Sequence, residues 1–381
     1  MITVVAVLAL AWFGRRAPPE PVYQGRTLMA WARDMNNPDA NARSNALAAL
    51  QTMGTNGSAG LIRVLEVRDP AVMKPFLWLA PKLPLWVRRS FVRSFKPFNA
   101  TADRLAAVRA FAAFGTNAPV SPLIHALRDH DRMIATEAAA ALGQMGKPAV
   151  PDLVRELRDS DGSVRLMACY TLGLIGPAAS PAAPVLIERL ADGYTNVSRQ
   201  AAYALGRIGG PAVPALAESL RKRDERIRAQ AARVLGGLSL RAKDATPALI
   251  EATKDSQGAV RQAAVEALCN VWPFSPEAVA ALAAALNDKN SDVRIQALQG
   301  LQRANRLAIS SIPALIEALN DQSPLMRGGA ALVLGALGPA AQPAVIALRK
   351  GLEDADESVR IQMQEALRKI EVPAAPPPGL P

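Results

Sequence analysis

The chain has 381 residues, of which 50% are hydrophobic and only 4% aromatic, so any core must consist mainly of alanine, leucine, valine and isoleucine. Its two cysteines are too few for a disulfide framework, which excludes the class of small cystine-rich secreted domains. The formal net charge is +11, but residues 1–109 carry +9 of it and the rest of the chain only +2. A basic character of the kind that attracts anionic partners is therefore confined to the first part of the chain.

Residues 1–16, MITVVAVLALAWFGRR, form an apolar run that ends in Arg15 and Arg16. The 12 residues from Ile2 to Phe13 would rise about 18 Å as a helix, less than a hydrocarbon core of about 30 Å. No basic region precedes the run, as it would in a signal peptide. We expect an apolar N-terminal anchor or signal remnant whose true start lies upstream, followed by a linker at residues 17–25. The sequence does not decide on which side of the membrane the repeats lie. Arg15 and Arg16 favour a cytoplasmic location for the chain that follows them, whereas a cleaved signal would place the repeats outside the cytoplasm.

An aspartate recurs along the chain at intervals of 30 or 33 residues, with one gap of 63, and an arginine usually follows six residues later. The recurrent aspartates are Asp129, Asp159, Asp192, Asp255, Asp288, Asp321 and Asp354. The arginines are Arg165, Arg228, Arg261, Arg294, Arg327 and Arg360, with Ala135 and Ser198 as exceptions. The sequence of each unit predicts a short first helix that starts at proline and an acidic turn that caps a longer second helix. In several units a glycine ends the second helix. No stretch alternates apolar and polar residues for long enough to predict a strand.

The recurring pattern PxLxxxLxDxxxxVRxxAxxxLGxIG resembles the HEAT repeat, in the short variety also found in phycobilin lyases and deoxyhypusine hydroxylase. About ten units fit between residues 26 and 371. The resemblance implies an all-α fold, an α-solenoid (right-handed superhelix) of about ten HEAT-like helix pairs. Ankyrin repeats have a similar period, but their TPLHxA signature is missing. The segment EPVYQGRTLMAWARDM is similar to the one that joins a membrane anchor to the first unit in bacterial HEAT-repeat proteins.

The recurrent aspartates and arginines are interpreted as structural. On a helical wheel Arg165 falls inside the apolar arc, and a buried charge without a partner costs about 3–5 kcal/mol. The acidic turns supply partners, and the resemblance implies a ladder of such residues between adjacent units. A catalytic pair would occur once, not in strict copies. The predicted ladder comprises Asp159, Arg165, Arg228, Asp255, Arg261, Asp288, Arg294, Asp321, Arg327, Asp354 and Arg360.

Two groups of residues are candidates for binding. The resemblance implies that second helices line the concave face, where Tyr170 and Tyr203 share one register and Arg199, Arg207 and Arg233 lie on the same stripe. Aromatic and arginine side chains are common anchors of interfaces, although an ordinary solvated face is the alternative. The second group belongs to a basic and aromatic insert at residues 70–101, which contains Trp78, Trp86, Arg88, Arg89 and Arg93. Packing on the first units, contact with lipid and contact with nucleic acid remain open for this insert.

No catalytic residue, metal or cofactor is predicted. His125 and His130 are the only histidines and neither precedes a glutamate, so the paired His-Glu motifs that bind iron in deoxyhypusine hydroxylase are missing. No phosphate-binding loop, GxSxG elbow or Cys-His arrangement appears. Cys169 and Cys269 lie three units apart, too far for a disulfide, and are expected to be small buried residues. Residues 372–381 are predicted to be a Pro-rich disordered tail.

These observations predict a non-catalytic, monomeric protein–protein interaction scaffold, associated with a membrane through its N-terminal apolar segment. The insert at residues 70–101 could in addition contact the membrane surface. The first alternative is a solenoid that binds nucleic acid, with affinity that falls steeply with salt. The second is a lyase-type enzyme related to phycobilin lyases. The sequence does not identify the partner protein.

Overall fold

The computed structural model describes residues 21–66, 100–115 and 118–371. The predicted anchor, the Pro-rich tail and residues 70–99 of the insert lie outside these ranges. The chain divides into two compact units, Met1–Ile175 and Gly176–Pro381. Each unit is an all-α row of helix pairs, as the resemblance to HEAT repeats predicts.

The N-terminal unit begins with a small hairpin that the sequence did not predict. Strands β1 (Val22–Tyr23) and β2 (Arg26–Thr27) pair antiparallel, with Val22 opposite Thr27. Gln24 and Gly25 join them with φ angles of 49° and 72°, the backbone that a tight hairpin turn requires. The predicted linker at residues 17–25 thus contains β1 and the turn of this hairpin in its described part. Two residues per strand are too few to show an alternating pattern.

The helices of the N-terminal unit come in first and second members of successive pairs. Helix α3 is broken at Gly54, where φ is 53°, so its two halves belong to different pairs. Contacts join α6 to α8, α8 to α10 and α7 to α9. The helices are α2 (Leu28–Asp34), α3 (Ala40–Glu66), α6 (Ala100–Ala113), α7 (Val120–Ala126), α8 (Arg132–Met145), α9 (Val150–Glu156) and α10 (Gly162–Ile175), with a 3-10 turn η3 (Lys147–Ala149) before α9.

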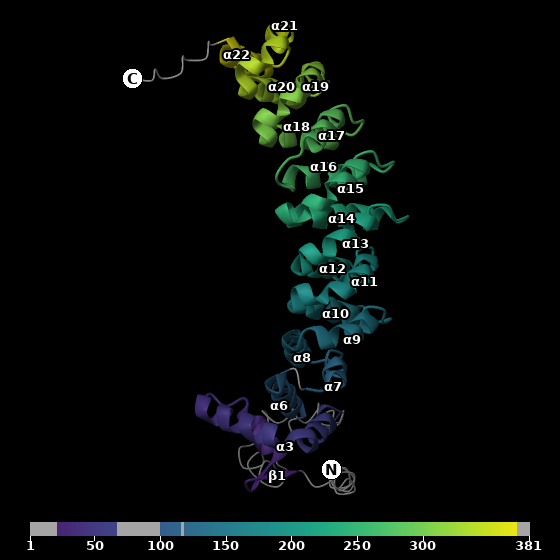
Figure 1. Ribbon diagram of the computed structural model, residues 1–381, viewed down its shortest axis with the longest axis vertical. Coiled ribbons are helices and arrows are strands. Elements are labelled where there is room, and N and C mark those ends of the chain that lie inside the picture. Colours follow the sequence, from purple (N-terminus) through teal and green to yellow (C-terminus); the bar gives the residue numbers. More distant parts are fainter. Residues whose placement is uncertain (1–20, 67–99, 116–117, 372–381) are drawn as a thin grey trace, which may run out of the picture. The chain divides into compact units, whose positions relative to one another are not determined.

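The C-terminal unit contains six helix pairs, each a short first helix followed by a longer second helix (Figure 1). First helices contact first helices of the next pair from α11 to α19, and second helices do the same from α12 to α22. The first helices are α11 (Ala183–Arg189), α13 (Val213–Ser219), α15 (Thr246–Ala252), α17 (Pro276–Ala285), α19 (Ile312–Ala318) and α21 (Val345–Lys350). The second helices are α12 (Thr195–Ile208), α14 (Glu225–Leu238), α16 (Gly258–Asn270), α18 (Ser291–Ala304), α20 (Pro324–Leu337) and α22 (Glu357–Glu371).

Short 3-10 segments connect most pairs of the C-terminal unit. They are η4 (Gly176–Ala182), η5 (Gly210–Ala212), η6 (Ser239–Ala245), η7 (Asn305–Ser311) and η8 (Gly338–Ala344), while η9 (Gly351–Glu353) lies inside the last pair. With the two halves of α3 counted separately, the described helices form ten pairs, four in the N-terminal unit and six in the C-terminal unit. The fold is therefore an α-solenoid of the predicted size.

Local sequence sets where the second helices begin and end. The Asp224 carboxylate accepts the backbone N–H of Arg226 at 2.8 Å, as an N-cap side chain does. Gly209 follows α12 with a φ of 73°, a left-handed conformation that glycine adopts without steric cost. Ser239 and Asn305 take the same position after α14 and α18 with a φ of 50°. Because these two helices end at residues other than glycine, the recurrence of glycine in the sequence did not predict their ends.

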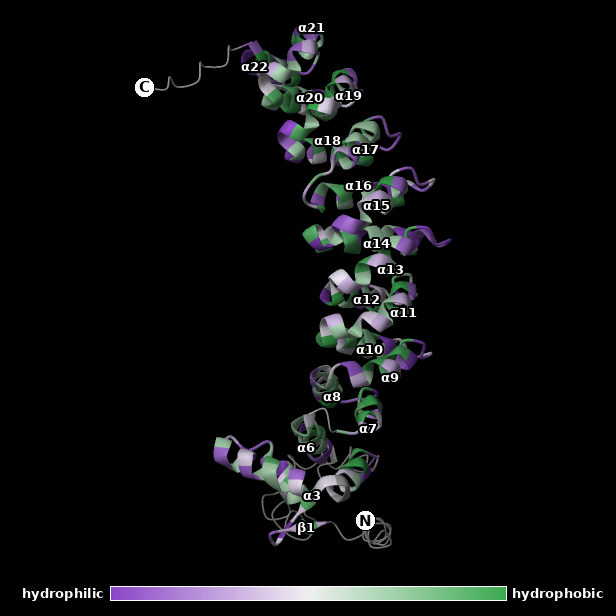
Figure 2. Ribbon diagram, viewed as in Figure 1, coloured by the Kyte–Doolittle hydropathy of each residue, from purple (hydrophilic) through white to green (hydrophobic). Residues whose placement is uncertain are grey.

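Small residues let neighbouring second helices pack closely. A Cβ atom at Gly236 of α14 would lie 2.9 Å from the Cα atom of Ala267 on α16. Gly335 of α20 stands in the same relation to Ala366 on α22, again at 2.9 Å. The core between the pairs consists mainly of buried alanine, leucine and valine, whereas hydrophilic residues gather at several turns between first and second helices (Figure 2). The low aromatic content follows from this close packing.

Within the residues that the structure describes, two stretches have the length and mean hydropathy of a membrane span, Gly162–Arg189 and Pro324–Glu353. Each consists of several short helices, and 56% and 44% of their apolar windows are buried within the fold. Core helices of water-exposed proteins commonly have this composition. Neither stretch coincides with the N-terminal segment in which the sequence predicts an anchor.

Candidate functional site

Four of the ladder arginines, Arg228, Arg261, Arg294 and Arg327, each bind two successive acidic turns. Arg261, on α16, donates through Nη1 to the backbone oxygens of Asp255 and Ser256 in its own turn, at 2.9 and 3.2 Å. Its Nε and Nη2 donate to Asp288 in the next turn, at 2.6 and 2.9 Å. Asp288 in turn accepts the backbone N–H of Asn290 at 2.8 Å. A single guanidinium group therefore holds one turn in shape and joins it to the next by a bidentate pair.

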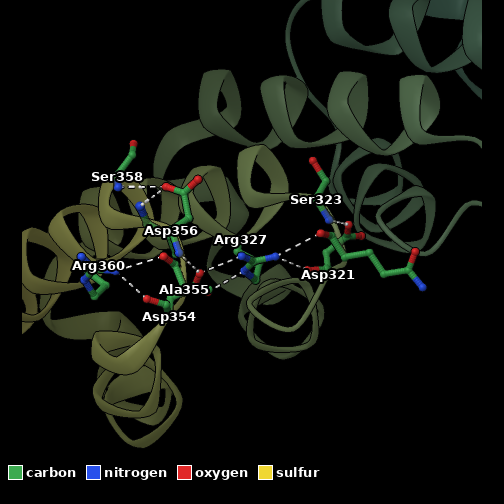
Figure 3. Close-up of polar contacts among 10 residues, drawn as sticks. Asp321, Ser323, Arg327, Asp354, Ala355, Asp356, Ser358 and Arg360 are labelled. Atoms are coloured by element: carbon green, nitrogen blue, oxygen red, sulfur yellow. Dashed lines mark hydrogen bonds and ion pairs between the residues drawn. The ribbon is translucent and has the colours of Figure 1, made fainter.

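The arrangement repeats through the C-terminal unit. The closest nitrogen–oxygen distances are 2.7 Å for Arg228–Asp255, 2.9 Å for Arg294–Asp321 and 2.6 Å for Arg327–Asp354. Figure 3 shows Arg327 between the turns of Asp321 and Asp354. Arg360 makes the same two bonds within its own turn, to the backbone oxygens of Asp354 and Ala355 at 2.8 and 3.2 Å.

In the N-terminal unit the ladder uses two arginines that the sequence pattern did not single out. Arg104 pairs with Asp129 at 2.9 Å, and Arg128 pairs with Asp159 at 2.7 Å. Arg165 donates to the backbone oxygen of Asp159 at 2.8 Å, while Arg128 binds the carboxylate of that aspartate. The pairs in the C-terminal unit are 27 residues apart, and these two are 25 and 31 apart. A search for arginines about one period before each aspartate would have found both.

The ladder shifts the pKa of its carboxyl groups downward. The hydrogen bond from Arg327 holds the pKa of Asp354 below its ordinary value of 3.8, and the backbone N–H of Asp356 adds to the effect. At Asp255 and Asp288 burial is the largest single effect and opposes ionisation, but hydrogen bonds from Arg228 and Arg261, backbone N–H groups and nearby positive charges together outweigh it and lower the pKa. These carboxylates are charged at neutral pH and engaged in the framework. Arg165 and Arg261 are themselves only 8% and 6% exposed.

The candidate binding residues of the second helices are divided between the two units. Tyr170, on α10 of the N-terminal unit, is half-buried. Arg199, Tyr203 and Arg207 lie four residues apart on α12 of the C-terminal unit, so they share one face of that helix. All three are exposed, with Tyr203 at 55%, and Arg233 on α14 is exposed as well. The insert candidates Trp78, Trp86, Arg88, Arg89 and Arg93 lie outside the described residues.

The remaining reactive side chains do not converge within the described ranges. Cys169 and Cys269 are buried and form no disulfide, and burial raises the pKa of Cys269 to about 12. His125 and His130 are exposed, and the described residues hold no group of three or more His, Cys, Asp or Glu side chains that could bind a metal ion. Two grooves of about 450 and 620 Å³ lie beside α15 and α17 and share Ile250 and Glu277. Ser275 and Glu277 both line the second groove, and Ser275 caps α17, where its Oγ accepts the backbone N–H of Ala278 at 3.2 Å.

Comparison with known proteins agrees with this geometry. The signature of HEAT repeats matches residues 99–158, 150–236, 213–302 and 279–368. The chain belongs to the HEAT-repeat family. No curated protein matches it.

Among solved structures, an engineered protein is 19% identical, with 90% of this chain and 98% of that chain covered and a TM-score of 0.41. The karyopherin Kap121p, bound to the extreme C-terminus of the protein phosphatase Cdc14p, is 12% identical, with 90% and 50% covered and a TM-score of 0.49.

Proposed function

We propose that this chain is a non-catalytic scaffold that binds a partner protein through the exposed face of its second helices. The observation that carries the proposal is that some arginines of the second helices are bound within the fold and others are exposed. The ladder arginines are bound by the turns, whereas Arg199 and Arg207 on α12 and Arg233 on α14 are exposed. Helix pairs stacked in a row offer an extended surface for a partner. We propose no cofactor and a monomeric scaffold.

We further propose that residues 1–16 tether the scaffold to a membrane. The support is the apolar run from Ile2 to Phe13 and the excess of positive charge in residues 1–109. The stretches Gly162–Arg189 and Pro324–Glu353 are less suitable, because much of their apolar surface packs within the fold. The basic and aromatic insert at residues 70–101 would then contact the membrane surface beside the tether.

The tether is tested by fractionation of cells that produce the full chain or a variant without residues 1–16. We expect the full chain in the membrane pellet after a carbonate wash and the shortened variant in the supernatant. Equal distribution of the two would contradict the tether. Light scattering on the detergent-solubilised full chain measures the oligomeric state.

The scaffold is tested by affinity purification of the full chain from native membranes after chemical cross-linking, with mass spectrometry of the captured proteins. Tyr170→Ala and Tyr203→Ala variants are purified in parallel. We expect one protein to be enriched with the wild type and reduced with at least one variant. Capture that both variants leave unchanged would remove these tyrosines from the binding surface. A bound chromophore in the purified protein would contradict the assignment as a non-enzyme.

A further inference from the structure

The surface formed by α12 and α14 carries positive charge that the fold does not use. Arg199, Arg207 and Arg233 are exposed, and none of them forms an ion pair within the described part of the chain. Helix α12 contains no acidic residue, and the only one in α14 is Glu225 in its first turn. Arg241, in η6, adds a cation at the end of α12, where its Nη1 lies 3.4 Å from the site of a Cβ at Gly209.

The positive surface is local to these two helices. The residue five positions after the ladder position is Tyr203 on α12, Arg233 on α14, Glu266 on α16 and Gln299 on α18. At this position the row of second helices therefore has a cation on α14, an anion on α16 and a neutral amide on α18. Clustered cations without counter-charges create a potential that attracts an anionic partner.

The side chains on α12 have a defined spacing. Arg199 and Arg207 are eight residues apart, which corresponds to about 12 Å along a helix axis. Tyr203 lies midway between them and is 55% exposed. In an extended peptide, residues i, i+2 and i+4 point to the same side, and i and i+4 are about 13 Å apart. Two carboxylates on either side of an apolar residue would match this row.

We propose that the surface of α12 and α14 binds an acidic, extended segment of a partner protein with the spacing Glu-x-Φ-x-Glu, where Φ is apolar. The two carboxylates bind Arg199 and Arg207, and the apolar side chain packs on Tyr203. Arg233, on the neighbouring helix about 8–10 Å away, binds a further acidic residue. This inference rests on the proposed function, because it specifies the partner of the same helix face.

The surface fits a protein segment better than nucleic acid. Binding of single strands uses a groove that follows the phosphates and several rings on which bases stack. Here Tyr203 is the single aromatic residue of α12 and α14, and residues 110–381 carry a net charge of only +2. Long-range attraction for a polyanion is therefore weak, whereas two guanidinium groups bind separate carboxylates well.

The test compares two labelled peptides of identical composition and charge by fluorescence anisotropy with the full chain. One is Gly-Glu-Ser-Leu-Ser-Glu-Gly and the other Gly-Glu-Glu-Leu-Ser-Ser-Gly. We expect the first to bind about fivefold more tightly, and Arg199→Ala or Arg207→Ala to weaken it about three- to fivefold each, as for exposed ion pairs. The control variant, Arg221→Ala/Lys222→Ala/Arg223→Ala, removes three exposed cations from the turn before α14 and should change the affinity less than twofold.

Three results would overturn the proposal. They are equal affinity for the two peptides, an equal loss of affinity in the control variant, and tighter binding of oligothymidine to the same arginines at the same ionic strength. Selection from a random peptide library separates this inference from the scaffold itself. If the selected peptides are neutral and their binding depends on Tyr203, the proposal of an acidic partner segment is wrong, but the proposed scaffold function is still supported. A library from which no peptide is enriched would count against both. Circular dichroism confirms that each variant is folded.

Discussion

At the level of single residues, the ladder arginine joins two acidic turns through one buried guanidinium group. Arg261 makes four hydrogen bonds, two to backbone oxygens of one turn and two to the carboxylate of the next. Its side chain is 8% exposed and that of Asp288 is 10% exposed, so water screens the pair little. Loss of the arginine leaves a poorly solvated carboxylate and two backbone acceptors without their donor.

We expect Arg261→Met to lower the free energy of unfolding by about 3 kcal/mol, near the lower end of the range for breaking a buried ion pair. The measurement is urea unfolding followed by circular dichroism. Arg349→Ala is the matched control, because the Arg349–Glu371 pair also joins two elements but its side chains are 66% and 42% exposed. That substitution should cost less than about 1 kcal/mol. Equal losses in the two variants would refute a structural role for the ladder.

Sequence reasoning predicted the ladder residues from their period and their place in the apolar arc. It could not assign each arginine to a carboxylate, because that choice depends on how adjacent units stack. Arg104 and Arg128 were missed since they stand at other distances from their aspartates. The exposed face of α12 was predicted, because residues four apart share a helix face, but the absence of counter-charges around it required the structure.

At the level of single helices and strands, the repeated sequence pattern predicted the number and type of helices, but it did not predict every helix end. The hairpin at residues 22–27 and the positive φ of Ser239 and Asn305 were missed. In each case a few residues adopt a backbone that their neighbours impose, and no periodic signal accompanies it. The distance between adjacent second helices is likewise a tertiary property, set by small residues at their contacts.

Two successive glycines of α14 test this close packing. A Cβ at Gly236 would lie 2.9 Å from the Cα atom of Ala267, whereas a Cβ at Gly237 would meet no atom within 4 Å. We expect Gly236→Ala to lower the free energy of unfolding by about 1–3 kcal/mol through overpacking. Gly237→Ala should instead raise it by about 0.5–1 kcal/mol, because alanine favours the helix. Urea unfolding distinguishes them, and the same sign for both changes would contradict the packing of α14 on α16.

The acidic turns give stability a defined pH dependence. The folded-state pKa values of Asp159, Asp255, Asp288 and Asp354 are lowered from 3.8. A lowered carboxyl pKa stabilises the fold fully above the unfolded pKa, and this contribution is lost as the pH falls through the folded value. We expect the urea midpoint to be nearly constant from pH 7 to about 5 and to fall below about pH 4. Asp288→Asn should flatten the fall, and a midpoint that rises on acidification would exclude this linkage.

At the level of the whole molecule, each unit is built by repetition of helix pairs rather than around one central core. Each pair contacts mainly its neighbours, so stability should approximate a sum of terms from pairs and from their interfaces. This organisation explains why ordered turns and exposed helix faces coexist: the ladder holds neighbouring pairs in register, and the exposed faces of the second helices take no part in that contact.

Hydrogen exchange of the full chain, measured by mass spectrometry for the wild type and Arg261→Met, tests the central claim that neighbouring pairs are held together by the ladder. We expect loss of protection in α16, α17 and α18, next to the substituted rung, and little change in α21 and α22. Local openings of this kind are what exchange detects. Unchanged protection around α16, or an equal loss in every described helix of the C-terminal unit, would contradict the claim.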